Sequence, residues 1–263
     1  MAIHPISHNA FASKYFLRTK NYAFASTDAL VALVAQEFPK AAMSMPIGFI
    51  ASGDGFIPVA VLGLQSGKNL FVSLDGRWLG GYIPAVFRGF PFSLADAEGG
   101  RQVLCVNDVS GSVSDTEGEP FFGEDQQPTA AVKEILNFLT QVASNQLLTQ
   151  KMMKVMQKHH LMAPWPIKLQ SLAQQEQLVE GLYRIDESVL SGLTAEALHE
   201  IHQSGALPLI YCQLMSMSHL QTLGKLAQAH FEAEQRAALP KTETGELDMS
   251  FLADDTTISF ENL

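Results

Sequence analysis

Four residues combine the side-chain types of a ligand pocket. Arg77 and Trp78 follow the turn in DGRW, and Tyr82 and Arg88 lie in the aromatic stretch that comes next. Arginines interleaved with aromatic rings can bind a planar or anionic ligand through charge and ring stacking. The same side chains serve equally well as stacked structural residues. The sequence therefore predicts a ligand site at Arg77, Trp78, Tyr82 and Arg88, and the structural interpretation stays open beside it.

His199 and His202 form a local pair with metal-ligand character. They lie three residues apart on a predicted helix, with Glu196 and Glu200 nearby. The HExxH zinc motif instead places its two histidines four residues apart, and a zinc site needs at least three protein ligands. An exposed amphipathic helix explains the pair better. The sequence therefore predicts no metal site, and no cofactor either.

Other catalytic motifs are missing from the sequence. It contains no GxxxxGK[ST], no GxGxxG after a strand and no GxSxG, so nucleotide chemistry and acyl transfer have no support. Cys105 and Cys212 lie far apart in apolar surroundings, and neither belongs to a CxxC pair. Buried free thiols explain them better than a disulfide or a nucleophile.

Composition and charge exclude several classes of protein. Of the 263 residues 47% are apolar and 17% charged, which indicates a folded chain with a sizeable core. The net charge of -10 comes mostly from two segments: residues 98–125 hold seven acids against one arginine, and residues 240–263 hold six acids against one lysine. The remainder is near neutral and has no basic stripe, so we expect no nucleic-acid partner.

Hydropathy along the chain predicts no membrane insertion. No apolar run reaches the roughly 18 residues that a membrane-spanning helix requires. The first residues show no basic segment ahead of an apolar one, so no secretory signal is predicted and we expect a cytoplasmic protein. The oligomeric state is left open by the sequence.

The elements that must position these residues change character along the chain. Asp28 could cap a helix over 30–34 that Pro39 ends. Residues 43–108 are β-rich, because short apolar runs alternate with SG and DG turns as in an antiparallel meander. The predicted strands are PIGFIA (46–51), FIPVAVLGL (56–64), LFVSL (70–74) and VLCVND (103–108), with a proline-rich break at 82–92.

The second half of the chain is mainly helical. An acidic loop covers 110–127, and Pro128 begins a helix whose apolar residues follow helical spacing. The later elements are a second helix or a continuation over 147–161, strands at 167–172 and 180–187, a helix over 194–203 capped at Gly205, and a long helix over 207–238. The predicted class is α+β. We expect one domain over 1–240, with a helix-rich part at 128–238, followed by an acidic tail at 241–263.

Two segments are candidates for binding a protein or peptide partner. Residues 151–162 are rich in methionine and lysine, which suits an adaptable groove, although methionines at helical spacing also suit an ordinary core. The acidic tail carries more large apolar residues than a solubilising tail needs. Thr257–Phe260 alternates as a strand does, so the tail could add to a sheet edge of its own domain or of a partner, with disorder as the alternative.

Several blocks of the sequence resemble one family. KYFLRTKNYAFAS, EFPKAAMSMPIGF, PVAVLGLQSGKNLFVSLDGRWLGGYIPAVFRGFPF, LVEGLYRIDESVLSGL and LHEIHQSGALPLIYCQLMSMSHLQTLGKL occur in the order typical of the SapC family. The resemblance covers about residues 14–228. It implies a bacterial protein whose family name comes from a surface-layer system, with no catalytic residues to transfer. It also implies genes near TonB-dependent receptors, flavoproteins similar to tryptophan halogenases, and cupin-like proteins.

The expected function is therefore binding without catalysis. We expect an accessory protein that recognises a protein or peptide partner in a surface-layer or TonB-dependent uptake system. The alternative is an enzyme with a pocket around the four residues named first and an acid such as Asp75 or Asp108 nearby. Convergence of those side chains in a deep pocket around a perturbed titratable group would favour the enzyme.

Overall fold

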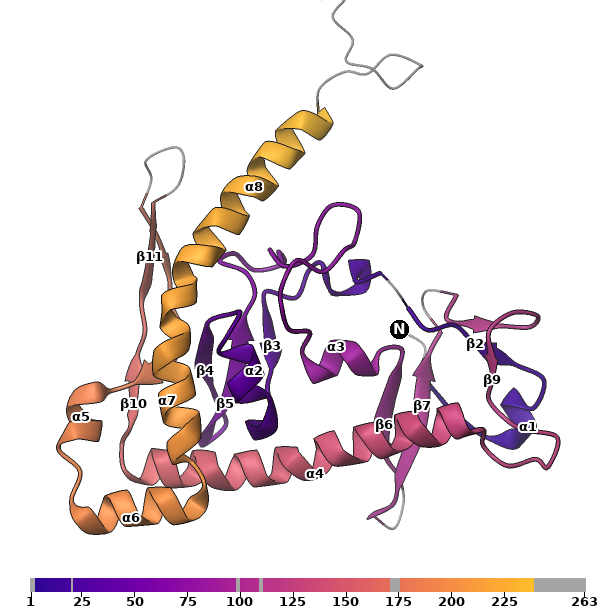
Figure 1. Cartoon of the computed structure of the whole chain (residues 1–263), viewed down its shortest axis with the longest axis horizontal. Helices are drawn as coiled ribbons and strands as arrows, with labels where there is room; N and C mark the ends of the chain where they lie inside the picture. The colour runs from indigo at the N-terminus through magenta and orange to yellow at the C-terminus, as the bar shows by residue number, and fades with distance from the viewer. Residues whose placement is uncertain (1–2, 20, 98–99, 109–110, 171–175, 239–263) are drawn as a thin grey trace, which may run out of the picture.

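The chain builds antiparallel sheets first and long helices afterwards (Figure 1). The computed structural model describes residues 3–19, 21–97, 100–108, 111–170 and 176–238. Ten of the strands in the described residues begin before residue 163, and the four longest helices described begin at or after residue 130. The predicted α+β class is confirmed. The predicted tail lies outside the described residues.

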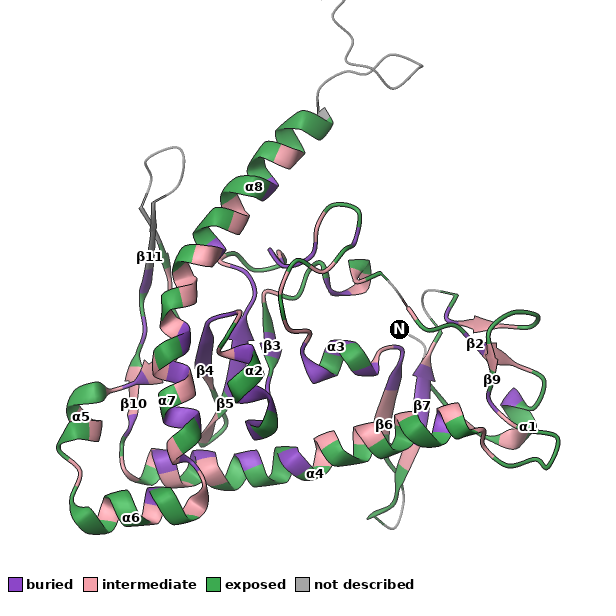
Figure 2. Ribbon diagram, viewed as in Figure 1, coloured by how far each residue is buried: buried purple, intermediate pink, exposed green. Residues whose placement is uncertain are grey.

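The largest sheet has five strands. Their order across the sheet is β10 (Met162–Pro164), β13 (Leu182–Ile185), β4 (Ile47–Ser52), β5 (Gly55–Val61) and β3 (Leu30–Ala32). Helices α4 (Ala130–Lys158) and α7 (Leu207–Ser216) pack on this sheet, and Figure 2 shows the buried residues concentrated on its strands and on the inner sides of these helices. Its core includes the fully buried side chains Phe38, Met45, Phe49, Met156 and Ile185.

Strand β3 leaves one edge of this sheet open. Leu33 N–H donates to Pro58 O at 2.9 Å and Leu62 N–H donates to Ala29 O at 2.8 Å, while Val31 stands opposite Ala60. In an antiparallel ladder the residues between these positions point their backbone groups the other way. The N–H and C=O groups of Leu30 and Ala32 therefore face outward, and no hydrogen bond within the described part of the chain reaches them.

Two buried polar side chains of α7 complete the ladder between β4 and β13. These strands pair only at Leu182 with Ile50 and at Tyr183 with Phe49. Beyond that point Gln213 takes over: its Oε1 accepts from Ile185 N–H at 3.0 Å and its Nε2 donates to Ile47 O at 3.1 Å. Ser216 Oγ accepts from Ile47 N–H at 2.9 Å. Both side chains are fully buried, so α7 is fixed to the sheet by hydrogen bonds as well as by apolar packing.

A second, smaller core lies at the other end of α4. It is bounded by the sheet β1 (Ile3–Pro5), β7 (Gln102–Asn107) and β6 (Phe92–Asp96), in that order. Val132 near the start of α4 packs in this cluster, whereas Met153 and Met156 near its end pack in the main core. The other members of the smaller cluster are Phe11, Phe16, Phe92, Leu104, Val106 and Phe121.

The shorter elements connect these parts. A hairpin of β11 (Ile167–Gln170) and β12 (Glu176–Val179) extends from the main sheet, as Figure 1 shows. The short helices are α1 (His8–Phe11), η1 (Ala23–Ala25), η2 (Ala35–Glu37), α2 (Phe38–Ala41), α3 (Ala85–Gly89), α5 (Glu187–Ser191), α6 (Ala195–Ser204) and η4 (Met217–His219). The last helix, α8 (Leu220–Ala238), projects away from the body of the molecule, and its far half is mostly exposed (Figure 2).

The acidic segment predicted as a loop contains two short strands. β8 (Val113–Ser114) and β9 (Glu119–Pro120) flank β2 (Tyr15–Phe16) in a three-stranded sheet. Lys14 pairs with Asp115, and Arg18 Nε lies 2.6 Å from Glu119 Oε1. The prediction of a loop without strands was wrong. Pairing with β2 and the ion pairs with Lys14 and Arg18 order the segment, and its turn-rich composition does not predict these distant contacts.

Two other expectations were wrong. Residues 30–34 form β3 and the approach to η2 instead of a helix, because pairing with β5 overrides the local pattern. Residues 70–74 form no strand and make only an isolated bridge between Val72 and Trp78. Pairing with β5 decides the first segment, whereas the backbone of residues 70–74 bonds to nearby residues such as Leu62, Arg77 and Leu79.

The helical predictions are largely confirmed. The helix from Pro128 and the segment 147–161 are one continuous helix, α4, capped by Thr129. Helix α6 begins after Thr194 and ends at Gly205, whose φ of 78° is the left-handed conformation that favours glycine. The helix predicted over 207–238 is interrupted by η4 between α7 and α8. None of the described helices is both long and apolar enough to cross a membrane.

We predict that Gln213→Leu lowers the free energy of unfolding by about 2–5 kcal/mol, because it leaves a buried N–H and a buried C=O without partners. Urea denaturation of both proteins measures the difference. The matched control is Gln146→Leu at an exposed position of α4, where the change should stay within about 0.5 kcal/mol. Equal effects at the two positions would show that the ladder does not depend on Gln213.

Candidate functional site

The structure brings together three of the four predicted site residues. Trp78 Nε1 donates to Tyr82 O at 2.8 Å, and Arg88 donates from a terminal nitrogen to the Tyr82 hydroxyl at 3.1 Å. Arg77 lies apart from them: it is exposed and pairs with Asp75 at 2.7 Å. The predicted residues therefore form a group of three around Tyr82, while Arg77 and Asp75 stabilise a surface turn.

Glu37 is the residue of this network that the sequence analysis missed. Its side chain is only 4% exposed. Oε1 accepts from the Tyr82 hydroxyl at 2.8 Å and from Ala85 N–H at 2.6 Å, and Oε2 accepts from Val34 N–H at 3.0 Å. Three donors satisfy the buried carboxylate, as burial of a charged group requires. Its partners lie up to 48 residues away, so no local motif marks it.

Aromatic rings and Arg88 enclose the network. Trp78 stacks on Phe71 with ring centroids 5.5 Å apart and meets Phe87 edge-on at 5.7 Å. The Arg88 guanidinium lies 4.9 Å from the Phe138 ring of α4, and its Nε donates to Ile83 O. Arg88 thus stacks on Phe138 and uses two of its five N–H groups within the fold, while its side chain stays exposed. This arrangement fixes α3 against α2 and α4.

Burial, followed by the charge and the hydrogen bond of Glu37, raises the pKa of Tyr82 to about 12, against the opposing effect of Arg88. A phenol with so high a pKa holds its proton at neutral pH and is a poor general base there. Tyr82 therefore acts as a hydrogen-bond donor to Glu37. Ligand binding by Trp78, Tyr82 and Arg88 stays a prediction.

We predict that Tyr82→Phe lowers the free energy of unfolding by about 1–3 kcal/mol at pH 7, because the buried carboxylate of Glu37 loses a donor. Thermal and urea denaturation measure the change. Tyr211→Phe is the control, since Tyr211 is 53% exposed on α7. A Tyr82→Phe protein as stable as the control would contradict a structural role for the hydroxyl.

The raised pKa of Tyr82 also predicts a pH dependence. Because the folded-state pKa of about 12 exceeds the ordinary value of about 10, the protonated hydroxyl stabilises the fold fully below pH 10. That contribution is lost as the pH rises from about 10 to about 12. The stability difference between the wild type and Tyr82→Phe should therefore narrow over this range in urea titrations, and a constant difference would contradict the assignment.

The other predicted chemical groups lie elsewhere. His199 and His202 are exposed on α6, and Glu200 points to α4 instead, where it pairs with Lys158 at 2.7 Å and with His159 at 2.9 Å. Among the described residues, no three histidine, cysteine or acidic side chains converge as metal ligands do. Cys105 is a buried free thiol and Cys212 a half-buried one. Burial raises the pKa of both thiols.

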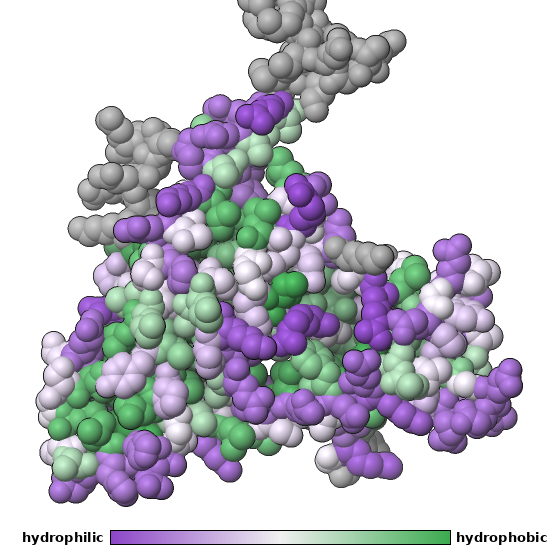
Figure 3. All heavy atoms as spheres, viewed as in Figure 1, coloured by the Kyte–Doolittle hydropathy of each residue, from purple (hydrophilic) through white to green (hydrophobic). Residues whose placement is uncertain are grey.

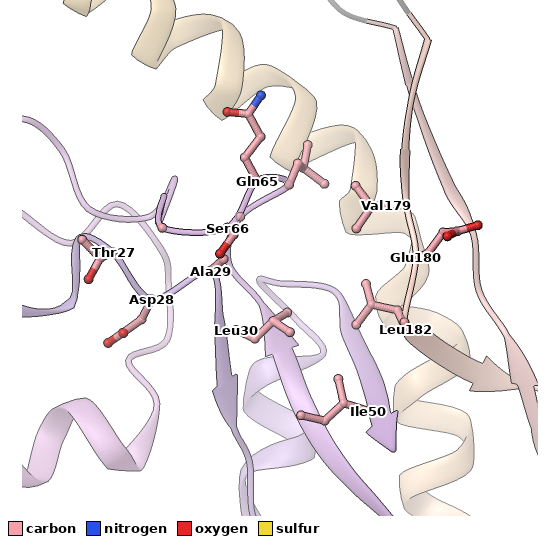
Figure 4. A pocket seen from close by; sticks show the side chains of 14 residues that line it. Thr27, Asp28, Ala29, Leu30, Ile50, Gln65, Ser66, Val179, Glu180 and Leu182 are labelled. Atoms are coloured by element: carbon pink, nitrogen blue, oxygen red, sulfur yellow. The ribbon is translucent and has the colours of Figure 1, made fainter. Parts of the chain in front are cut away.

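A pocket of about 420 Å³ opens away from this network and extends across the main sheet from β3 to β13. It is lined by residues 27–30, by Ile50 of β4, by the loop 63–67 after β5, and by residues 179–182 from the end of β12 to the start of β13. In Figure 4 the side chains of Leu30, Ile50, Val179 and Leu182 point toward a common space, with Gln65 and Ser66 at its rim. The lining combines these apolar side chains with polar groups from residues 27 and 28, from the loop 63–67 and from Glu180.

The two acids in the pocket wall lie at its margins. Asp28 and Glu180 point away from the apolar space in Figure 4. Desolvation raises the pKa of Asp28, which lies directly before the open edge of β3. Gly181, with a φ of 85°, turns the chain from the β11–β12 hairpin into the sheet and so shapes one wall. The sequence predicted a helix start at Asp28 and Leu30 and strands or turns elsewhere in the lining, and it did not predict the pocket, because the pocket forms only where distant segments meet.

The fold is α+β, and the pocket lies on the main sheet next to the start of its edge strand β3. The SapC family model matches residues 6–223, and the chain belongs to this family. The predicted resemblance is thereby confirmed. No curated protein and no solved structure matches the chain.

Proposed function

We propose that this SapC-family protein is a non-catalytic accessory protein that binds an extended apolar segment of a partner at strand β3. The observation that carries the proposal is the pocket that begins at Leu30, next to the outward-facing backbone groups of Leu30 and Ala32. A peptide that adds a strand to β3 gains backbone hydrogen bonds there, and every second side chain then faces the same side of the sheet.

The chemistry of the pocket sets the kind of segment it accepts. Leu30, Ile50 and Leu182 belong to three strands and present hydrocarbon to the space between them. Burying one leucine-sized side chain there contributes about 1.5–3 kcal/mol before ordering costs. Asp28 and Glu180 at the margins disfavour acidic residues at the rim. The preferred ligand is thus a short strand with alternating apolar residues and no acids next to them.

Binding fits the geometry better than catalysis at the four predicted site residues. Arg77 and Asp75 lie outside the network, Asp108 is exposed, and Trp78 and Arg88 donate hydrogen bonds within the fold. We therefore assign the Glu37–Tyr82–Arg88 network to the support of α3. The family membership supports the further proposal that the partner belongs to a surface-layer or TonB-dependent uptake system, with the protein acting in the cytoplasm.

A labelled peptide tests the binding site. The probe is a fluorescein-labelled ten-residue peptide of alternating isoleucine and threonine with a terminal lysine, titrated with the full chain by fluorescence polarisation. We expect saturable binding that weakens about tenfold in Leu30→Gln, since partial loss of one buried leucine contact costs about 1.4 kcal/mol. Leu147→Gln, at an exposed leucine of α4 outside the pocket, is the matched control and should bind as the wild type does.

A second variant separates the sheet edge from the pocket. Ala32→Pro removes the outward N–H group of β3, and proline is tolerated at such an edge position. Circular dichroism checks that this variant folds. We expect it to lose binding of the peptide. Unchanged affinity in both Leu30→Gln and Ala32→Pro would show that the segment does not bind at β3.

A further inference from the structure

The last helix passes the loop that forms one wall of the pocket before it projects from the body of the molecule (Figure 1). Glu234 Oε1 of α8 lies 2.7 Å from Lys68 Nζ, and Lys68 directly follows Gly67 in the wall of the pocket. His230 Nε2 lies 3.0 Å from Leu70 O, so a second contact fixes α8 beside the same loop. Helix α8 ends at Ala238, about one turn beyond Glu234. The chain therefore leaves α8 within a few side-chain lengths of the pocket.

The residues that follow have the length and the pattern that the site accepts. Residues 239–256 separate α8 from Thr257–Phe260, and an extended chain of that length spans up to about 60 Å. Thr257, Ile258, Ser259 and Phe260 alternate polar and large apolar side chains. In a strand, Ile258 and Phe260 share one face, which is the arrangement that an edge strand beside an apolar pocket requires.

We propose that the segment Thr257–Phe260 of the same chain docks on the outer edge of β3 and places an apolar side chain in the pocket. The proposal rests on the proposed function of this site, and it states which segment occupies the site when no partner is bound. The local concentration of a tethered segment is in the millimolar range for short flexible linkers. An external peptide must therefore displace the tail, and the protein binds its partner only when the partner segment competes well.

The acids of the tail favour docking through Thr257–Phe260 over docking through the acidic residues on either side of it. Asp254 and Asp255 precede the alternating segment and Glu261 follows it. Since Asp28 stands at the start of β3, an acid inside the pocket would be repelled and desolvated. Five residues without charge, Thr256–Phe260, lie between these acids, and the alternating segment Thr257–Phe260 is within them.

Hydrogen exchange at the sheet edge tests the docking in the full chain. NMR measures the exchange rates of the Leu30 and Ala32 amides, which face outward in the structure. We expect both amides to exchange about tenfold or more faster in Ile258→Ser/Phe260→Ser than in the wild type, because local opening governs such rates. Thr257→Ala/Ser259→Ala changes the opposite face of the strand and is the control that keeps the protection.

Equal and fast exchange of both amides in all three proteins would overturn the proposal. Protection that increases with protein concentration would overturn it as well, because it would assign the site to the tail of a second copy. The peptide probe separates the two hypotheses: we expect Ile258→Ser/Phe260→Ser to bind it about tenfold more tightly than the wild type. If the wild type and Ile258→Ser/Phe260→Ser bind the peptide equally and neither protects the Leu30 and Ala32 amides, only the docked tail is contradicted. If Ile258→Ser/Phe260→Ser does not bind the peptide at all, the proposed function is contradicted.

Discussion

The buried amide of Gln213 is the interaction on which the main sheet depends. Strands β4 and β13 pair at two positions only and then separate, and the gap between Ile47 and Ile185 is filled by the Gln213 side chain. A glutamine amide has one acceptor and two donors, so it can replace a backbone peptide in a ladder. The hydrogen bonds of Gln213 hold β13 next to β4. They therefore help to place Leu182 beside Ile50, and both residues line the pocket.

Glu37 illustrates how a buried charge can be structural. Burying a carboxylate is costly unless hydrogen bonds satisfy it, and here three donors do so: Val34 in its own turn, and Tyr82 and Ala85 just before and at the start of α3. The neighbouring backbone is satisfied in the same way, since Asn145 and Thr149 of α4 accept from Gln36 N–H and Ala35 N–H. The turn between β3 and α2 is thus held from α3 and from α4. Its rigidity keeps the open edge of β3 in place.

The sequence predicted the elements that depend on local signals. Helix α4, the cap at Thr194 and Gly205, and the β4–β5 hairpin all follow from periodicity and turn residues. It failed where distant partners decide, as at β3, whose three residues become a strand only through β5. The same limit applies to the candidate sites. Trp78, Tyr82 and Arg88 lie together and are close in sequence, although Arg77 lies apart from them, whereas Glu37 and the pocket are defined only in the assembled fold.

The partner-binding segments show a related limit. The methionines of residues 151–162 were ambiguous in the sequence, and Met153 and Met156 prove to be core residues, while Met152 is partly buried against them. Apolar side chains gather instead over α5 and α6, at the lower left of Figure 3. Nothing in the sequence distinguishes these apolar residues from core residues. Only the packing of short helices reveals which of these side chains remain at the surface.

Helix α4 contributes side chains to both hydrophobic clusters. With 29 residues it is about 43 Å long, and it contributes Val132 to the smaller hydrophobic cluster and Met156 to the larger one. A helix is cooperative along its length, because each turn supports the next. Disorder that begins at one cluster therefore removes a wall of the other. The two clusters therefore share one helix, although their side chains form separate groups.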